Sequence, residues 1–249
     1  MISKVINYCW FGKAPIPNKV KKCIIDSWKK YFPDYEIKQW NESNFDINCC
    51  SYVREAYKLK KWAFVSDYAR FKILYENGGV YFDTDVEVIR DMHDIIETGP
   101  YMGYESFYAD DKINLEKETL VNPGVGLAAE KGMDIYKEIL NYYEKQHFLN
   151  SDGSINYATV VERVTEILRK NGLIPNGKMQ KVKGITIYPS DYFCPLNHMT
   201  GQLNITANTR SIHLYTASWQ SKSARFIGRI RRSLPPFILN LVLRVKHHE

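Results

Sequence analysis

The chain has 249 residues, of which 45% are hydrophobic and 14% are aromatic, enough for one large α/β domain with or without a small appendage. The formal net charge is +6, but residues 220–249 hold seven Lys or Arg against one acid, Glu249, so the whole excess lies in the C-terminal tail. The rest of the chain is formally neutral, which excludes the charge pattern of a nucleic-acid-binding domain.

Cysteine usage and hydropathy indicate the compartment. The five cysteines are an odd number without zinc-like spacing, which favours reduced thiols in a cytosolic protein. The N-terminus lacks the apolar region of a signal peptide. The longest apolar stretch, residues 237–243, is far shorter than the roughly 20 residues of a membrane-spanning helix. We expect a cytoplasmic protein.

Strands and helices alternate in the first half of the chain. Residues 4–10 alternate and carry β-branched side chains, which predicts a strand, and 35–40 predict a second one. Apolar side chains recur at helical spacing through residues 20–28, and a short helix is expected over 52–58.

An apolar stripe from Phe64 to Tyr75 predicts a further helix, which Asn77-Gly78-Gly79 should end because glycine accepts the left-handed conformation. The short apolar runs at 80–82 and 86–89 follow.

The remaining elements complete an α/β pattern. Strands are expected at 125–128 and 184–188, and helices at 135–143 and 160–168. This order predicts a central, mixed, mostly parallel sheet. In such sheets ligands bind at the carboxyl ends of the strands, where Trp10 and two aspartates fall.

Those aspartates form the segment Asp83-Thr84-Asp85. In an extended segment both carboxylates point the same way, and two hard oxygen ligands suit Mg²⁺ or Mn²⁺. A divalent cation neutralises a departing diphosphate. A solvated, Asp-rich turn is the alternative, but the apolar run before the motif and the two glycines before that run favour an acidic pair at the end of a buried strand.

Asp67 and Arg70 lie one turn apart on the preceding helix and share a face with Phe71 and Leu74. A charged pair on an apolar face needs partners. It is either an intrahelical ion pair or a site that binds sugar hydroxyls and phosphate oxygens.

Three blocks of sequence, taken together, resemble glycosyltransferase family 32, which contains the sugar-binding DXD proteins and capsular polysaccharide synthesis enzymes. They are the segments 6–12 (INYCWFG), 62–86 (WAFVSDYARF…YENGGVYFDTDV) and 213–219 (HLYTASW), so the resemblance spans about residues 4–219. The glucosyltransferase domains of large clostridial toxins are more distantly similar.

The resemblance implies a GT-A fold, Mn²⁺ or Mg²⁺ dependence, and transfer with retention from a nucleotide diphosphate sugar. A UDP-sugar is favoured as the donor of a hexose or N-acetylhexosamine to a glycan acceptor in surface or capsular polysaccharide synthesis. The sugar, its base and the acceptor are not specified by the sequence.

The resemblance also implies roles for individual residues. Asp67, Arg70, Asp83 and Asp85 would form the catalytic set, and Asp83, Asp85 and His213 would bind the metal. Relatives often carry a second histidine where this chain has Leu214. Donor binding would involve Trp10 (stacked on the base), Tyr81, Asn122, Ser218 and Trp219. Without the family, Trp10 would be a core residue and Asn122 part of a turn.

We expect a catalytic domain over residues 1–220 and a basic, amphipathic tail over 221–249. The tail is expected to dock on anionic membrane, where lipid-linked acceptors reside, and so to place the protein on the inner face of the cell membrane. The alternatives are a helix packed on the body or a dimer contact.

Two other function classes remain open at this point. Phosphatases of the haloacid dehalogenase class also use D-x-D, but on their first strand and followed by a small hydroxyl residue where this chain has Glu87. A non-catalytic carbohydrate- or cation-binding module would use the 18 tyrosines as its surface. A dinucleotide oxidoreductase is disfavoured because no G-x-G-x-x-G follows the first strand.

Overall fold

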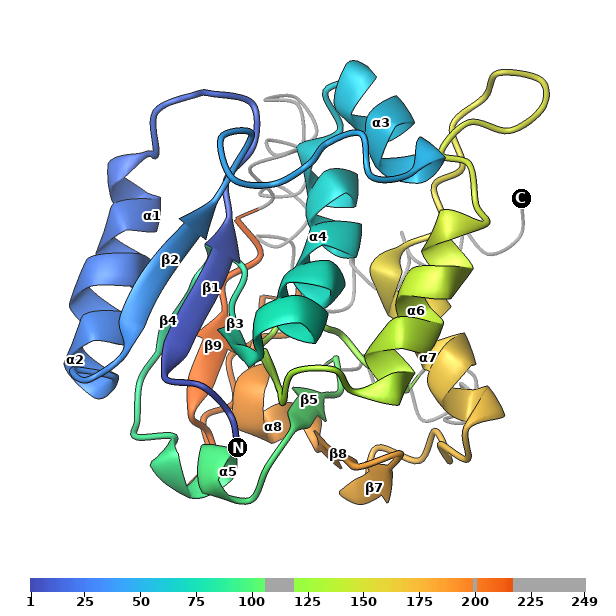
Figure 1. The fold of residues 1–249 in the computed structure, drawn as a ribbon. Coiled ribbons are helices and arrows are strands. Elements are labelled where there is room, and N and C mark those ends of the chain that lie inside the picture. The colour runs from blue at the N-terminus through green and yellow to red at the C-terminus, as the bar shows by residue number, and fades with distance from the viewer. Residues whose placement is uncertain (106–118, 199–200, 217–249) are drawn as a thin grey trace, which may run out of the picture.

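The computed structural model describes residues 1–105, 119–198 and 201–216. A seven-stranded sheet forms the centre of this part (Figure 1). Its strands, in spatial order, are β2 (Glu36–Trp40), β1 (Val5–Cys9), β3 (Gly79–Tyr81), β6 (Leu127–Ala129), β5 (Tyr101–Gly103), β8 (Ile185–Tyr188) and β7 (Gln180–Val182). Strands β6 and β7 run against the other five. The predicted fold class, a mixed and mostly parallel α/β sheet, is confirmed.

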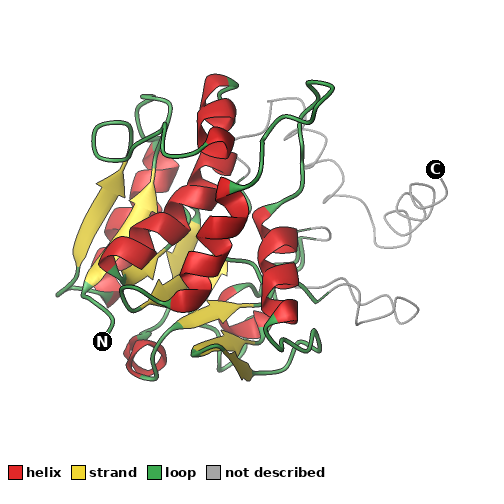
Figure 2. Ribbon diagram, turned by 45° about the vertical axis from the view of Figure 1, so that its right-hand side comes forward, coloured by secondary structure: helices red, strands yellow, loops and turns green. Residues whose placement is uncertain are grey.

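Helices cover both faces of the sheet (Figure 2). One face packs against α3 (Ser51–Lys58), α4 (Trp62–Asn77), α6 (Asp134–Glu144) and α7 (Val160–Lys170). The other face packs against α1 (Asn18–Lys22), α2 (Lys29–Tyr31), α5 (His93–Glu97), α8 (Ser190–Phe193) and a two-stranded ribbon of β4 (Val86–Val88) and β9 (Ser211–His213). Successive side chains at and after β3 point to opposite faces of the sheet. Val80 and Phe82 pack on the second face, and Tyr81 packs on the first.

Helix α4 is the main connection between the sheet and the helical layer. Its apolar side chains are buried over most of its length. The helix ends at Gly78, whose φ is +68° and whose backbone N–H donates to Leu74 O at 2.8 Å. The stop predicted at Asn77-Gly78-Gly79 is therefore confirmed, and the chain turns directly into β3.

The helix predicted over residues 20–28 is correct in place but not in type. A π-helical turn, Cys23–Trp28 (η1), separates α1 from α2. Within it, the Ser27 hydroxyl donates to Cys23 O at 2.6 Å and accepts from Val88 N, and Trp28 Nε1 donates to Val86 O. The wider turn thus directs two side chains onto the otherwise open edge of β4, which propensity alone does not reveal.

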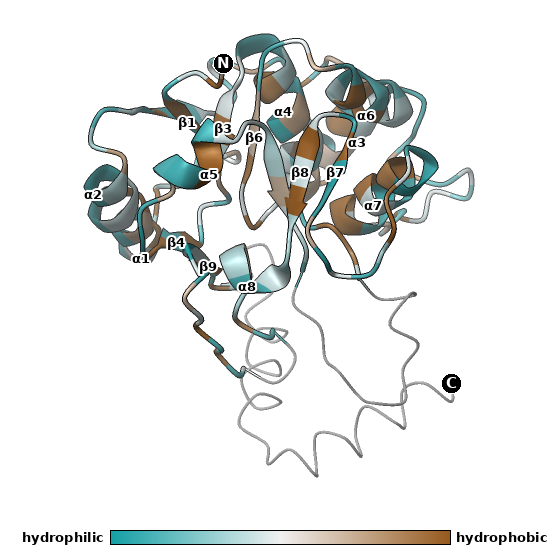
Figure 3. Ribbon diagram, turned by 90° about the horizontal axis from the view of Figure 1, so that it is seen from below, coloured by the Kyte–Doolittle hydropathy of each residue, from teal (hydrophilic) through white to brown (hydrophobic). Residues whose placement is uncertain are grey.

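Helix α7 begins with a capping box, in which Thr159 Oγ1 accepts from Glu162 N and Glu162 Oε2 accepts from Thr159 N. Figure 3 shows apolar and polar segments together on α7, while β8 in the core is mostly apolar. No sequence pattern predicted β5, β7, β9, α5 or α8, none of which exceeds five residues.

Candidate active site

Two neighbouring parallel strands end at the same edge of the sheet. Strand β1 pairs with β3 through Ile6–Val80 and Asn7–Tyr81. Trp10 follows β1 and Asp83 lies just past β3, so both sit at carboxyl ends, the usual ligand-binding edge. The side chain of Asn7 links β1 to its two neighbouring strands, because its Nδ2 donates to Val80 O and its Oδ1 accepts from Trp40 Nε1.

The Asp83-Thr84-Asp85 segment is a turn and not the extended segment we expected. Val86 N donates to Asp83 O at 3.0 Å, which closes the chain between β3 and β4. The two carboxylates are therefore brought together by a reversal of the backbone, and strand alternation does not explain their approach.

Arg70 joins two acidic side chains inside the domain. Its Nη2 lies 3.0 Å from Asp67 Oδ1 and 3.2 Å from Asp83 Oδ1, and only 4% of its side chain is exposed. The Tyr81 hydroxyl donates to Asp83 Oδ1 at 3.2 Å, and the Tyr81 ring lies under the Arg70 guanidinium. The side chain of Asp83 remains 26% exposed, so it can reach a ligand while Arg70 holds it from behind.

Burial sets the protonation behaviour of this group. It raises the pKa of Asp67 to about 7, against the opposing charge of Arg70. Burial also raises the pKa of Asp83, again with Arg70 opposing it. Burial alone would lower the pKa of Arg70, but Asp83, Tyr81 and Asp67 outweigh it and the pKa is raised. Arg70 therefore stays a cation, and both carboxyl groups depend on it to ionise.

Asp85 is held by the segment that follows β9. Its Oδ2 accepts from Thr216 N at 2.8 Å and Thr216 Oγ1 at 3.0 Å, and its backbone O accepts from Leu214 N. His213 Nε2 lies 3.3 Å from Asp85 Oδ1. The pairing of β4 with β9, in which Val86 faces His213, brings these distant parts of the sequence together.

The donor set at this point fits a divalent cation. Asp85 Oδ1 and His213 Nε2 are separated by about the 3 Å expected of adjacent ligands with roughly 2.1 Å bonds. His213 is buried, and its Nδ1 has no hydrogen-bond partner among the described residues. Over 1–105, 119–198 and 201–216, however, no three acidic, histidine or cysteine side chains already form a closed metal-binding cluster.

A loop with no room for a side chain borders Asp83. A Cβ on Gly124 would lie 2.4 Å from Asp83 Oδ2 and 2.9 Å from Asn122 Oδ1. Asn122 is buried, its Oδ1 accepts from Gly124 N, and its Nδ2 donates to Glu105 Oε1 at 3.4 Å. The peptide backbone thus approaches the acidic pair directly.

Comparison with known proteins agrees with this arrangement. Residues 17–101 match the family model described as the glycosyltransferase sugar-binding region containing a DXD motif. The chain is also 22% identical over 205 residues to an uncharacterized glycosyltransferase, L373, of Acanthamoeba polyphaga mimivirus, covering 79% of this chain and 74% of that one. The chain is a glycosyltransferase with a DXD sugar-binding region. The phosphatase and non-catalytic alternatives are set aside, and the donor is a nucleotide sugar.

Solved structures give distant likenesses. PaToxG glycosyltransferase is 18% identical, covers 68% of this chain and 69% of its own, and has a TM-score of 0.46. A glycosyltransferase involved in glycosylation of the major capsid of PBCV-1 is 12% identical, with 89% and 96% coverage and a TM-score of 0.46. The galactosyltransferase LgtC is 16% identical, with 93% and 84% coverage and a TM-score of 0.43. At these TM-scores the likenesses bear on neither substrate nor mechanism.

The structure brings together most of the site residues predicted from sequence. Asp67, Arg70, Asp83 and Tyr81 form one contact group, and Asp85 and His213 another beside it. Tyr81 is buried, so its contact with a ligand would pass through Asp83. Trp10 is half-buried, and its Nε1 donates to Ala14 O. Ser218, Trp219 and the tail at 221–249 lie outside the described residues.

Several residues at the site were not singled out from sequence. Gly124 lies in a turn whose asparagine alone was considered, and Thr216 lies inside the block at 213–219 that carries the family resemblance. Tyr215 lies in the same block, but neither it nor Glu105 signals the other in the sequence, because the two meet only when the fold is complete.

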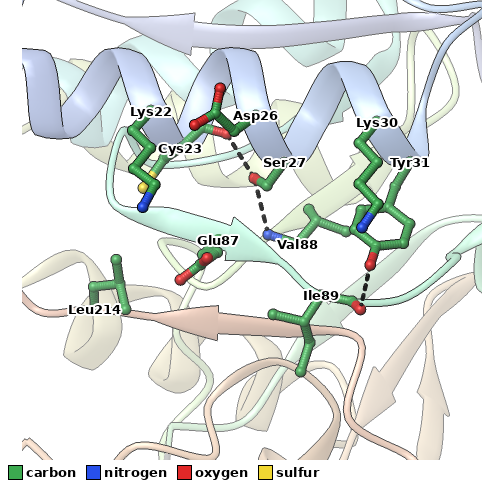
Figure 4. A pocket seen from close by; sticks show the side chains of 10 residues that line it. All are labelled: Lys22, Cys23, Asp26, Ser27, Lys30, Tyr31, Glu87, Val88, Ile89 and Leu214. Atoms are coloured by element: carbon green, nitrogen blue, oxygen red, sulfur yellow. Dashed lines mark hydrogen bonds between the residues drawn. The ribbon is translucent and has the colours of Figure 1, made fainter.

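A separate cavity of about 310 Å³ lies between the α1–α2 segment and the β4–β9 ribbon (Figure 4). Lys22 and Lys30 flank it, with Glu87 and Ile89 of the β4 side below them. Lysine and carboxylate side chains balance there, and none of its lining residues belongs to the enzyme's candidate catalytic set.

Proposed function

We propose that the enzyme is a metal-dependent, retaining transferase that moves a hexose or N-acetylhexosamine from a UDP-sugar to a glycan acceptor in surface or capsular polysaccharide synthesis. The observation that carries this proposal is the approach of His213 on β9 to Asp85, in the same turn as Asp83, next to a buried arginine. Oxygen and imidazole donors are the ligands that Mn²⁺ and Mg²⁺ accept in enzymes that cleave diphosphates.

In this proposal Asp85, His213 and Asp83 hold Mn²⁺ or Mg²⁺. When bound, the ion would neutralise charge on the diphosphate as the glycosidic bond breaks. Thr216 keeps its hydrogen bonds to Asp85 Oδ2, which leaves Oδ1 and the His213 ring for the ion. Support for His213 comes from its buried ring, whose Nε2 lies 3.3 Å from Asp85 Oδ1, a separation that fits two ligands of one ion.

Asp67 and Arg70 are proposed to orient the donor sugar. Arg70 is too deeply buried to be a mobile contact, so its main effect is to keep the Asp83 carboxylate charged and fixed. The backbone at Gly124 lies against Asp83 and is proposed to border the donor sugar there. Trp10, at the neighbouring strand end, is proposed to stack on the base, and Asn122 to approach the donor.

Transfer with retention is proposed to proceed by attack of the acceptor hydroxyl on the face that the diphosphate leaves. The new bond joins the acceptor oxygen to the anomeric carbon, the bond to the phosphate oxygen breaks, and the acceptor proton passes to that oxygen. Asp67, Asp83 and the backbone near Gly124 hold the donor for this step. Trapping a covalent sugar on any Asp or Glu would overturn this route in favour of double displacement.

The proposal is tested by screening UDP- and GDP-sugars for hydrolysis with Mn²⁺, Mg²⁺ or a chelator. A UDP-sugar should be cleaved, and the chelator should abolish cleavage. Asp83→Asn and Asp85→Asn should each lower the rate by a factor of about 100 or more, a loss typical of electrostatic groups in active sites. Asp152→Asn, on an exposed turn, is the matched control and should keep full activity. Unchanged hydrolysis in both site variants would refute the proposed metal site.

We further propose that residues 221–249 bind an anionic membrane and keep the enzyme at its inner face, near a lipid-linked acceptor. The tail's seven basic residues and apolar segments support this. Over the described residues, no helix is long and apolar enough to cross a bilayer. Truncation after Ser221 should reduce pelleting with anionic liposomes while donor hydrolysis persists. Equal pelleting of both forms would refute the membrane role.

A further inference from the structure

The segment from His213 to Thr216 contacts two different parts of the domain. His213, Leu214 and Thr216 all contact Asp85, two of them by hydrogen bonds. Tyr215, between them, points elsewhere, and its hydroxyl donates to Glu105 Oε1 at 2.9 Å. This short segment therefore contacts the proposed metal ligand Asp85 and also, through Tyr215, the residue Glu105 that follows β5.

Tyr215 can do this only in an unusual backbone conformation. Its φ is +46°, in the left-handed region that a large non-glycine side chain rarely adopts. Such strain persists where surrounding contacts impose it. Here the Tyr215 ring packs edge-on against His213 at 4.2 Å between centroids, and the Cys194 thiol lies 3.0 Å from the hydroxyl.

Glu105 is held in place by hydrogen bonds of its backbone and its side chain. It follows β5, and its backbone N–H donates to Leu120 O at 2.8 Å. Its Oε1 accepts both the Tyr215 hydroxyl and the amide of Asn122, whose loop borders Asp83 through Gly124. A continuous series of contacts thus links Asp83 to Asp85. It runs through the Asn122–Gly124 loop, Glu105, Tyr215 and His213.

We propose that Glu105 and Tyr215 are positioning residues, whose hydrogen bond holds the His213–Thr216 segment in the conformation that presents Asp85 and His213 together. They act through Asp85 and His213 and do not themselves bind the metal or the sugar. This inference rests on the proposed metal site, although the positioning itself can be measured without metal.

The metal-free test is amide hydrogen exchange at Thr216, whose N–H is bonded to Asp85. Tyr215→Phe keeps the ring but removes the hydroxyl, and Glu105→Ala removes the acceptor. Each should speed exchange at Thr216 about tenfold, and the effect of the double variant should fall well short of the product of the two single effects, because both remove the Tyr215–Glu105 bond. Tyr192→Phe, the same change on neighbouring α8, is the control and should leave exchange unchanged.

The second test is titration of Mn²⁺ into the protein with saturating UDP, followed calorimetrically. Tyr215→Phe and Glu105→Ala should each weaken binding about tenfold, as expected when ligands are no longer oriented. Glu105→Gln retains an oxygen that accepts from Tyr215 and should bind within about twofold of wild type, at an unchanged transfer rate.

Failure of the inference and failure of the proposed function give different results. Wild-type protein that takes up no Mn²⁺ would remove the metal site itself. Normal exchange at Thr216 in Tyr215→Phe would overturn the positioning role even if Mn²⁺ binds. A Glu105→Gln enzyme as inactive as Glu105→Ala would also overturn it, because the carboxylate charge, and not the hydrogen bond, would then be required.

Discussion

Replacing Arg70 tests whether one buried cation supports the whole acidic group. Arg70→Met keeps most of the side chain's volume but leaves Asp67 and Asp83 without their shared partner. Breaking a buried ion pair by removing one member costs about 3–5 kcal/mol, and the partial exposure of Asp83 favours the lower end of that range. Urea unfolding should show this loss near neutral pH as a lower midpoint with an unchanged denaturant slope.

The loss should depend on pH in a defined direction. Arg70 lowers the pKa of both Asp67 and Asp83, so removing it raises their folded-state pKa values further above the ordinary 3.8. A carboxyl group with a raised folded-state pKa adds stability below its unfolded pKa, and that stability is lost as pH rises through the folded pKa. For Asp67 the variant should therefore fall further behind wild type as pH rises through and above the wild-type pKa of about 7.

A matched control lies on the same helix. Lys72 forms an i,i+4 ion pair with Glu76 at the surface of α4, and Lys72→Met should cost under about 1 kcal/mol. If Arg70→Met were no more costly than Lys72→Met, or if its loss did not grow with pH, the assignment of Arg70 as the required counter-charge would be refuted.

Three further predictions follow from single contacts. Gly124→Ala should displace Asp83 and lower donor hydrolysis by a factor of about 10–100; normal kinetics would show that the loop moves freely. Asp67→Asn should remove a component of stability that wild type loses between about pH 4 and the Asp67 pKa of about 7, and an identical pH slope in urea titrations would contradict this. Thr159→Ala should cost about 1 kcal/mol by opening the capping box of α7, with Thr159→Ser costing less than half of that.

The parts of the fold that sequence predicted are those whose signals are local. The stripe from Phe64 to Tyr75 and its glycine stop give α4 to within two residues at each end. By contrast, the π-helical turn at Cys23–Trp28 depends on contacts of Ser27 and Trp28 with a strand about 60 residues away, and no periodicity reports it. Three-residue strands such as β5 are set by neighbouring strands more than by their own side chains.

The residues of the candidate site also fall into those that a local sequence pattern predicts and those that it does not. The spacing of Asp67 and Arg70 predicted their pairing, whereas only the family resemblance placed Asp83 with them. Glu105 and Tyr215 are separated by 110 residues, and although Tyr215 lies in the 213–219 block, no spacing links it to Glu105. Arg163 was equally hidden, since its position among valines predicts a helix but not a guanidinium enclosed by the rings of three tyrosines.

The β4–β9 ribbon also bears on how the enzyme is made. Its strands are separated by more than 120 residues, so a growing chain can build β1, β2, β3 and α4 long before residues 211–216 leave the ribosome. Until then Asp85 lacks the Thr216 and His213 contacts and is one more acidic side chain on an incomplete edge. A nascent chain that stalls in this interval would carry the DXD segment without these contacts of Asp85, which form only after residues 211–216 have emerged.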